Sequence, residues 1–414
     1  MKPGMFNILV GGQWGSEGKG MAASALVTRY RPDILTTTNM ANAGHCEEDI
    51  DGERFVAKAL PSCAILSKWM NKVGGRLIGE SPYEPRVIVG ATAAFTISQL
   101  MAEAELCGLT SNGRLSIHPR TGVITEEHKK RENGGVGLEG STKHVASTMQ
   151  GCGAFLADKV MRKDGLKLAR DWPELKRFVQ HEGEGWPAKW TNETVLHEGA
   201  QGFSLDINHG SHYPHCTSRG TTAMQMAADM GVPANKVGDV YLVLRPFPIR
   251  VGNVYEEGKQ VGFSGGHYAD QEEISWEEVG RNAGMPDEVI KALLDKELTT
   301  VTRRLRRVFS LSMEQIRQSV RINGATRIIL NFANYIDYGC YKMQNSSPQR
   351  KLANQLPDKV RAMINSIESA TKIPVFAVGT GPRRNHVLWN YSKELRDNDP
   401  LHLHSLRAID EDTA

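Results

Sequence analysis

The sequence predicts an α/β fold with a mostly parallel central sheet covered by helices. Short apolar, β-branched runs typical of buried strands recur at 6–10, 34–38, 86–90, 195–197, 240–244, 327–332 and 374–378. Helical patterns are interspersed with them at 19–30, 93–107, 153–162, 221–230, 286–298, 313–322 and 357–370. Because strands that alternate with helices form parallel sheets, we expect ligands beyond the carboxyl ends of the strands.

The composition is that of an ordinary globular protein. The 414 residues are 40% hydrophobic, and 50 basic against 47 acidic residues give a formal net charge of +3. This balance predicts no general affinity for nucleic acids or membranes. No segment has the ~20 apolar residues of a membrane span. The six cysteines form no C-x-x-C pair, which favours a reduced, cytoplasmic compartment.

We expect the whole chain to form one large α/β domain. A polar, glycine-rich stretch lies at 126–141, and a segment rich in Trp, Gly and Pro lies at 181–190. Neither resembles a linker between independent domains, so both are predicted to be long loops. The excursions from this single domain, residues 1–414, are expected at about 45–85, 126–146, 181–194 and 299–310.

The first glycine-rich segment has the features of a phosphate-binding loop. The strand at 6–10 runs directly into GGQWGSEGKG at residues 11–20, and a helix follows. Backbone amides in such a loop, together with the helix dipole, favour an anion, and Lys19 supplies a cation. A P-loop carries Ser or Thr after its lysine, whereas Gly20 stands here. The sequence therefore predicts a P-loop-NTPase-like fold with a variant phosphate loop, and a glycine turn with a surface lysine is the alternative.

The string QWGSEGKG is similar to the N-terminal signature of adenylosuccinate synthetases. Those enzymes join aspartate to the 6-position of a purine nucleotide, driven by a nucleoside triphosphate. Further segments resemble the family in the same order: NAGH at 42–45, STMQGCG at 147–153, DKVMR at 158–162, EGAQG at 198–202, LDI at 205–207, TTVTRRLRR at 299–307 and GTGP at 379–382. The matched blocks run from residue 10 to about 382, with one residue inserted between Gly210 and Thr217.

The resemblance implies catalytic and substrate-binding roles. The catalytic residues are Ser16, Lys19, His45 and Gln201, with His45 as general acid on the transferring phosphoryl group, a role that suits the pKa of histidine. The substrate nucleotide is expected to bind Ser16, Asn42, Ser147, Thr148, Arg162, Gln201 and Thr217. Because family members complete their sites as dimers, Arg162 is expected to reach the phosphate in the partner subunit of a homodimer.

The remaining roles concern aspartate, the triphosphate and Mg²⁺. Aspartate brings two carboxylates, which arginine forks bind well, and its expected ligands are Thr300, Val301, Thr302, Arg304 and Arg306. Arg303 replaces a glycine of the family loop. The triphosphate is expected at Gly15, Glu17, Gly18, Lys19, Gly20, Gly44, His45, Asn331, Asn334, Gly379, Gly381 and Pro382, and Mg²⁺ at Ser16 and Gly44. Four arginines within 303–307 also resemble a nucleic-acid patch, but the balanced net charge argues against one.

Ser16 is the first departure from the family, which carries an aspartate there. That aspartate removes the N1 proton of the 6-oxopurine, which serine cannot do near pH 7 without activation. Serine leaves room for the 2-amino group of guanine and can accept an N–H bond. A viral branch that also has serine here makes N6-succino-2-amino-2'-deoxyadenylate from dGMP and aspartate. Water, the triphosphate and solvent oriented by Gln201 are the candidates for removing the proton.

The second departure lies at LNFANY, residues 330–335, where the family carries a lysine and an aspartate that bind guanine in GTP. Phe332 stands opposite the lysine and Asn334 opposite the aspartate. Asparagine offers one donor and one acceptor, which suits adenine. We therefore expect ATP or dATP in place of GTP, and neutral drift in a tolerant loop is the alternative.

These observations predict a ligase that joins L-aspartate to C6 of dGMP through a 6-phosphoryl intermediate. It would use ATP or dATP with Mg²⁺ and give N6-succino-2-amino-2'-deoxyadenylate, ADP and phosphate, in the cytoplasm of a host cell if the source is viral. The preference for deoxyribose comes from the resembling branch alone. One alternative is an ordinary adenylosuccinate synthetase acting on IMP, and another is an inactive purine-nucleotide-binding paralogue. Retention of Lys19, His45 and the arginine loop argues against the paralogue.

Overall fold

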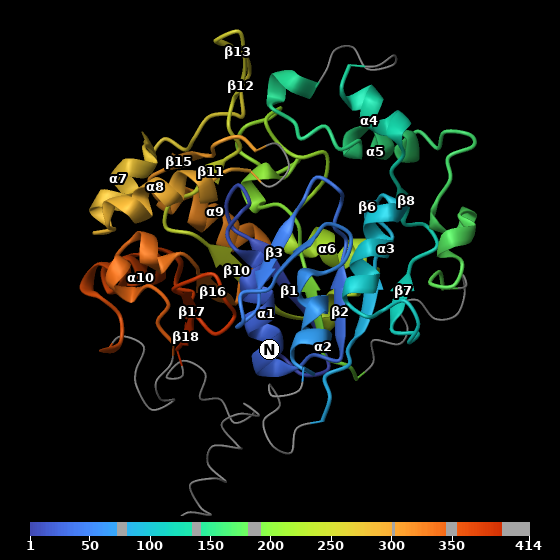
Figure 1. The fold of residues 1–414 in the computed structure, drawn as a ribbon, viewed down its shortest axis with the longest axis horizontal. Helices are drawn as coiled ribbons and strands as arrows, with labels where there is room; N and C mark the ends of the chain where they lie inside the picture. Colours follow the sequence, from blue (N-terminus) through green and yellow to red (C-terminus); the bar gives the residue numbers. More distant parts are fainter. Residues whose placement is uncertain (73–80, 135–141, 181–191, 300–302, 345–353, 391–414) are drawn as a thin grey trace, which may run out of the picture.

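The strand expected at 6–10 lies in the middle of the central sheet of the computed structural model (Figure 1). The structure describes residues 1–72, 81–134, 142–180, 192–299, 303–344 and 354–390. In these residues the sheet has nine strands, in the order β18 (Val387–Trp389), β17 (Val375–Gly379), β16 (Arg327–Leu330), β10 (Val237–Leu244), β1 (Phe6–Gly11), β9 (Val195–Glu198), β2 (Ile34–Thr37), β5 (Arg86–Val89) and β7 (Leu115–Ile117). Neighbouring strands are parallel except β17 and β18. The prediction of a mostly parallel α/β sheet is confirmed.

Helices cover both faces of this sheet, because successive side chains of a buried strand point to opposite sides. In β1, Leu9 packs into one apolar cluster, whereas Ile8 and Val10 pack into another. The first cluster includes α1 (Lys19–Tyr30), α2 (Leu66–Trp69) and α3 (Ile97–Leu106). The second includes α6 (Ala223–Asp229), α9 (Met313–Asn323) and α10 (Asp358–Thr371).

All seven expected helices are present, with ends that shift by a few residues. They are α1, α3, α6, α9 and α10, named above, together with α5 (Cys152–Val160) and α8 (Asp287–Lys296). The described residues contain ten α-helices in all. Helix α1 has the predicted bounds because Gly18 begins it and Arg31 ends it, both in the left-handed conformation. Helix α3 starts later than predicted because Thr96 caps it, accepting from the amide of Gln99, and residues 94–95 form a strand instead.

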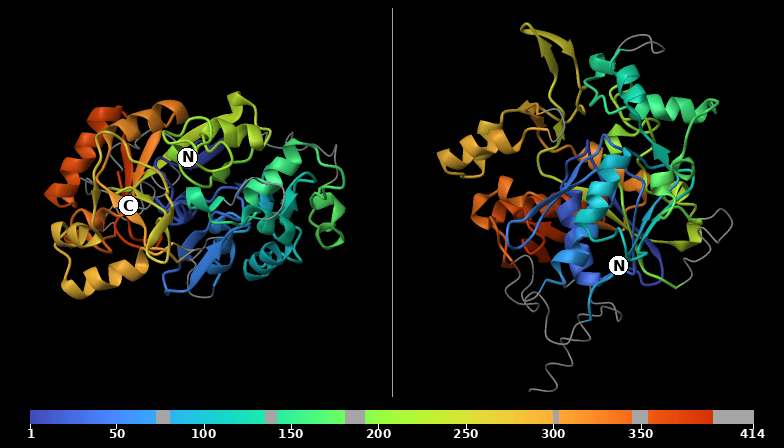
Figure 2. Two further views of the ribbon diagram at one scale, coloured as in Figure 1. Left: turned by 90° about the horizontal axis from the view of Figure 1, so that it is seen from above. Right: turned by 45° about the vertical axis from the view of Figure 1, so that its right-hand side comes forward.

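Several short elements were not predicted. They are the hairpin β3 (His45–Glu48) and β4 (Arg54–Ala57), the pair β6 (Ala94–Phe95) and β8 (Gly122–Val123), the sheet of β11 (Ile249–Arg250), β15 (Arg307–Phe309) and β14 (Glu273–Ile274), the hairpin β12 (Val254–Glu256) and β13 (Lys259–Gly262), and helix α7 (Trp276–Asn282). Figure 2 shows β12 and β13 projecting from the body of the molecule.

The expectation of a loop at 126–146 was wrong for its first part, which forms helix α4 (Glu126–Glu132). Thr125 and His128 form a capping box at its start, with the Thr125 amide 3.0 Å from Nδ1 of His128. Acidic residues in its first turn and basic residues in its last turn complement the helix dipole. Residues 73–80, 135–141, 181–191 and 300–302 of the predicted excursions lie outside the described residues.

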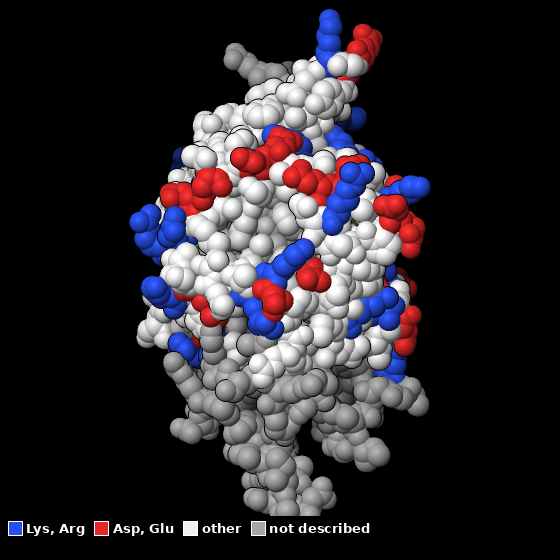
Figure 3. Space-filling model, turned by 90° about the vertical axis from the view of Figure 1, so that its left-hand side faces the viewer, with Lys and Arg blue, Asp and Glu red and all other residues white. Residues whose placement is uncertain are grey.

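The described residues include no helix that is long and apolar enough to cross a membrane. On the face that carries α7, α8 and α10, basic and acidic side chains are interspersed (Figure 3).

Candidate functional site

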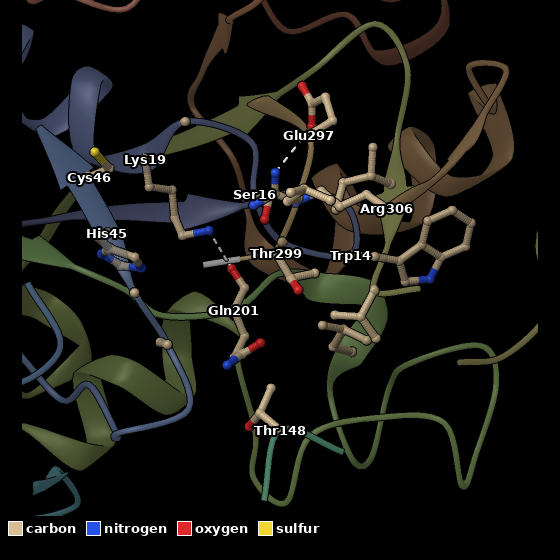
Figure 4. A pocket seen from close by; sticks show the side chains of 18 of the residues that line it. Trp14, Ser16, Lys19, His45, Cys46, Thr148, Gln201, Glu297, Thr299 and Arg306 are labelled. Atoms are coloured by element: carbon tan, nitrogen blue, oxygen red, sulfur yellow. Dashed lines mark hydrogen bonds and ion pairs between the residues drawn. The ribbon is translucent and has the colours of Figure 1, made fainter. Parts of the chain in front are cut away.

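A cavity of about 1810 Å³ lies beyond the carboxyl ends of the central strands. Its lining includes the loop after β1, Gln201 after β9, Arg245 after β10 and Asn331 after β16. Single ligand pockets usually measure about 300–1,000 Å³. The cavity is therefore large enough for more than one small molecule. In Figure 4, Lys19 and His45 lie on one side of it, and Trp14 and Arg306 lie on the other.

The glycine-rich loop is held from inside by the buried carboxylate of Glu17. One of its oxygens accepts from the amides of Gln13 and Gly15, at 3.1 and 2.7 Å. The other is 2.8 Å from Nζ of Lys19, which also donates to the carbonyl of Gln201 at 2.5 Å. Lys19 thus lines the cavity, whereas Glu17, which was predicted to bind the triphosphate, is fully buried and shapes the loop instead. Such a loop presents backbone amides and a cation to a phosphate.

Two asparagines at the end of β16 have different surroundings. Nδ2 of Asn331 donates to the carbonyls of Glu17 and Gly18, at 2.8 and 3.0 Å. A Cβ on Gly18 would lie 2.8 Å from that same nitrogen, so the approach needs glycine. Asn334 lies in the short 3₁₀ helix η7 (Ala333–Tyr335), where it is buried against the cavity. Asn331 therefore anchors the phosphate loop, and Asn334 is placed to contact a ligand.

Arg245, which sequence reasoning missed, ties the phosphate loop to the arginine segment. Its guanidinium donates to the carbonyl of Ser16 at 3.2 Å, lies 3.3 Å from the carboxylate of Glu297, and sits 4.4 Å from the ring centre of Phe332. Glu297 also pairs with Arg306 at 3.3 Å. Burial alone would raise the pKa of Glu297, but Arg245 and Arg306 hold it below its ordinary value. The sequence signal that could have identified Arg245 is its position as a charged residue directly after the buried strand β10.

The imidazole of His45, at the start of β3, is oriented by Glu198 at the end of β9. Nδ1 lies 2.5 Å from Oε1 of Glu198. The backbone amide of Ser62 donates to the same carboxylate at 2.6 Å. Although burial would raise the pKa of Glu198, the neighbouring His45 lowers it. In the sequence, Glu198 is only the first residue of the family-like segment EGAQG, and no role was predicted for it.

The predicted substrate residues come together from distant parts of the chain. Asn42, Ser147, Thr148, Gln201 and Thr217 all line the cavity. Nδ2 of Asn42 lies 3.4 Å from Oγ1 of Thr217, although the two residues are 175 positions apart. Figure 4 shows Thr148 and Gln201 on neighbouring parts of the wall. Hydroxyl and amide groups gathered in this way suit a phosphate and a purine edge.

Other predicted residues do not reach this cavity within one chain. Arg162 is exposed just beyond α5 and does not line it. Gly379 packs behind the wall, where a Cβ would lie 2.5 Å from Oδ1 of Asn331, whereas Gly381 and Pro382 line the cavity. The predicted aspartate ligands at 300–302 lie outside the described residues.

The arginine segment divides between two cavities. Arg303 and Arg306 line the large one, whereas Arg304 lines a smaller cavity of about 460 Å³ beside Glu273. Arg303, which stands in place of a family glycine, has a φ of 53°, in the left-handed region that favours glycine. The backbone at this position is therefore of the kind that glycine adopts, despite the substitution.

The donors available to Mg²⁺ are oxygen atoms. The Ser16 hydroxyl and the Gly44 backbone belong to residues that line the cavity, and the described residues contain no cluster of three or more acidic, histidine or cysteine side chains suited to a metal. Mg²⁺ in phosphoryl-transfer sites takes one or two protein ligands together with phosphate oxygens and water. This donor set fits a Mg²⁺ ion that arrives with a nucleotide.

Comparisons with known proteins agree with this geometry. A family model described as adenylosuccinate synthetase matches residues 8–179 and 173–339. The N6-succino-2-amino-2'-deoxyadenylate synthase of Vibrio phage phiVC8 is 37% identical over 333 residues, covering 78% of this chain and 84% of the phage protein. The adenylosuccinate synthetase of Methanocaldococcus jannaschii is 32% identical over 385 residues, covering 92% and 95%.

A solved structure has the same fold. It is the succinoaminodeoxyadenylate synthetase of cyanophage S-2L, bound to dGMP and to dATP as an energy donor. The TM-score is 0.72 at 27% sequence identity, and the match covers 95% of this chain and 99% of the cyanophage chain.

Proposed function

Because the chain belongs to the adenylosuccinate synthetase family, ligases that form a C–N bond with aspartate, we propose that it joins L-aspartate to C6 of dGMP. ATP or dATP drives the reaction, which gives N6-succino-2-amino-2'-deoxyadenylate. The observation that carries this proposal is Ser16, whose short side chain stands in an otherwise family-like phosphate loop beside Lys19 and His45. The Vibrio phage and cyanophage relatives carry names for this same activity.

The proposed reaction has two steps. O6 of guanine attacks the γ-phosphorus, the bond from that phosphorus to the β–γ bridging oxygen breaks, and ADP or dADP leaves as N1 passes its proton to solvent or to the triphosphate. The neutral aspartate amine then attacks C6, the C6–O6 bond breaks, inorganic phosphate leaves, and the nitrogen gives up one proton to solvent. Lys19 and the loop amides stabilise charge on the transferring phosphoryl group. His45 donates a proton to that group, oriented by Glu198.

Mg²⁺ held near Ser16 and Gly44 would neutralise phosphate charge when bound. Side chains of this protein bind and orient the two substrates. The Asn42, Thr148 and Thr217 side chains hold the phosphate end of dGMP, and Gln201 lies near the purine 6-position. Arg306 lines the part of the cavity proposed for aspartate, and Arg304, which lines the neighbouring cavity, joins it only if the segment rearranges.

Adenine specificity is assigned to Asn334. Its buried amide offers a donor and an acceptor at the cavity wall, close in sequence to Phe332. A carboxylate there would face the ring nitrogen acceptors of adenine with a second acceptor. The cyanophage relative is bound to dATP, which supports an adenine nucleotide as the energy donor.

A homodimer is part of the proposal because Arg162 is exposed and does not line the cavity of its own chain. The neighbouring Val160 and Met161 are 76% and 75% exposed, which is unusual for large apolar side chains. An interface at this end of α5 would cover them and bring Arg162 to the partner's substrate phosphate.

A competition experiment tests the proposed function. The protein is incubated with aspartate, Mg²⁺ and an equimolar mixture of dGMP and IMP, with either ATP or GTP, and products are followed by mass spectrometry. The succino-2-aminodeoxyadenylate mass is expected to dominate with ATP. Faster turnover of IMP would instead support an ordinary adenylosuccinate synthetase, and a preference for GTP would overturn the role of Asn334.

A further inference from the structure

The hydroxyl of Ser62 lies between two buried carboxylates. Its Oγ is 2.9 Å from Oε1 of Glu47 and 2.8 Å from Oε1 of Glu198. Ser62 and Glu198 are fully buried, and Glu47 is 1% exposed. The contact lies directly behind the catalytic imidazole, because Glu198 also bonds His45.

Two buried carboxylates that meet the same hydroxyl favour an additional proton between them. Ser62 has one hydroxyl proton and can donate it to one carboxylate only. Its backbone amide already donates to Glu198 at 2.6 Å, and Nδ1 of His45 faces the other oxygen of Glu198. Glu198 is therefore bound as an ionised acceptor. The Ser24 hydroxyl also lies beside Glu47, but two ionised carboxylates joined by the Ser62 hydroxyl in a buried site would repel each other, which is strongly unfavourable.

We propose that Glu47 is protonated in the resting enzyme and donates its acid proton to Ser62, which in turn donates to Glu198 and thereby fixes the carboxylate that orients His45. Glu47 is a positioning residue, since it acts on His45 through two other side chains. The consequence for catalysis rests on the proposed function, whereas the protonation of Glu47 does not depend on it.

The surroundings of Glu47 favour its neutral form. Burial raises its pKa to about 8, and the negative charge of Glu198 adds to the effect. The hydroxyls of Ser24 and Ser62 and the charge of Arg384 lower the pKa of Glu47 and act in the opposite direction. The titratable and charged groups that influence Glu47 or its neighbours in this pocket are Glu198 on β9, His45, Cys46 and Glu48 on β3, Arg54 on β4, Cys63 beside Ser62, and Arg384.

The proposal predicts a specific alkaline effect. As pH rises through about 8, Glu47 loses its proton, and Ser62 then faces two carboxylates. Glu198 loses a donor and gains a negative neighbour, so the orientation of His45 weakens. We expect kcat to fall more than KM for dGMP and ATP changes, because Glu47, although it lies at the cavity wall, acts on His45 through Ser62 and Glu198.

The test compares E47Q with E47A and with E53Q, an exposed residue of the same β3–β4 hairpin. Glutamine retains a donor toward Ser62 and does not titrate, so E47Q is expected to lose the alkaline fall in kcat. E47A removes the donor and is expected to lower kcat at all pH values. E53Q is expected to follow the wild-type pH profile. Identical pH profiles for wild type and E47Q would overturn the positioning role.

Two measurements do not depend on catalysis. Infrared spectra at pH 7 should contain a protonated carboxylic acid carbonyl band that E47Q lacks and E53Q retains. The raised pKa means that wild type loses stability as pH rises from the ordinary glutamate value of 4.5 toward about 8, whereas E47Q does not. The Tm of E47Q minus that of wild type should therefore grow over this range. A missing band or a constant Tm difference would overturn the protonation, even if the enzyme acts on another purine.

Discussion

Nδ1 of His45 lies 2.5 Å from Oε1 of Glu198, which joins the start of β3 to the end of β9. Because Glu198 is buried and its pKa is held low by its neighbours, it accepts only, and Nδ1 carries the proton. The second imidazole nitrogen is then left to work toward the cavity. This pairing orients the imidazole of His45 and suits it to the acid role that we propose for it.

We predict that Glu198→Gln lowers kcat by about 10²-fold or more, in line with the usual contribution of a general acid. The amide of Ser62 must still meet an oxygen, so the glutamine NH₂ turns toward Nδ1. A glutamine NH₂ group facing Nδ1 disfavours a proton on that nitrogen. It therefore disfavours the imidazolium form, which His45 would need in order to act as an acid. Steady-state kinetics would check this, with His45→Asn as comparison. Equal loss in E198Q and the E198Q/H45N double variant is expected, and strictly additive losses would contradict the pairing.

The sequence was sufficient for features that are local along the chain. The strand at 6–10 and the glycine loop form one continuous pattern, and β1 and α1 follow it closely. Strand β18 and the short hairpins were missed because two to four residues carry too little periodicity. Their pairing partners, not their own composition, decide their structure.

The same distinction applies to the site. Lys19 and His45 lie in strings that can be recognised, and the structure brings both to the cavity. The contact of Arg245 with Ser16 spans 229 positions, and no local pattern predicts it. Asn331 and Asn334 were both expected to bind the triphosphate, yet of these two Asn331 is the one that bonds the phosphate loop. Roles that depend on a distant partner need the folded chain.

We predict that Asn334→Asp shifts nucleotide use toward GTP. A lost complementary contact and an unpaired acceptor cost about 1–3 kcal/mol, or roughly 5- to 150-fold in kcat/KM for ATP. Asn331→Asp is the matched control. It loses the donor to the carbonyls of Glu17 and Gly18, so activity with both nucleotides and Tm should fall. An unchanged ATP/GTP ratio in N334D would show that adenine is bound elsewhere.

We predict that Arg303→Gly is more stable than Arg303→Ala by about 1 kcal/mol. Both variants remove the same charge from the cavity, but only glycine adopts the observed φ of 53° without a clash from Cβ. Urea unfolding of the two variants measures the difference. Greater stability of the alanine variant would mean that this segment relaxes out of the left-handed conformation.

We predict that acid destabilises the protein in part through His197. Burial lowers its pKa to about 3, and its Nδ1 lies 2.9 Å from Oγ1 of Thr36. Nε2 is buried without a hydrogen-bond partner, so a second proton there would be unpaired. The stability due to the lowered pKa is fully present above pH 6.5 and falls by up to about 1.4 kcal/mol per pH unit toward pH 3.

The variant His197→Gln isolates that contribution. It is expected to be less stable than wild type at pH 7, because it loses packing against Phe6. The difference in free energy of unfolding should shrink as pH falls from 6.5 to 5. A difference that stays constant would mean that His197 does not remain neutral in the folded protein.

We predict that Ser16→Asp moves substrate preference from dGMP toward IMP. Ser16 has a φ of 56°, a conformation that aspartate also tolerates, and Arg245 holds its carbonyl. The added carboxylate supplies a base for N1 and occupies the space that the guanine 2-amino group would need. We expect kcat/KM for IMP to rise and that for dGMP to fall. Ser16→Ala, which keeps the space and removes the hydroxyl, should preserve the preference for dGMP at a lower rate. If S16D gains activity on IMP with undiminished activity on dGMP, the size of residue 16 does not select the purine, and the proposed basis of guanine recognition fails.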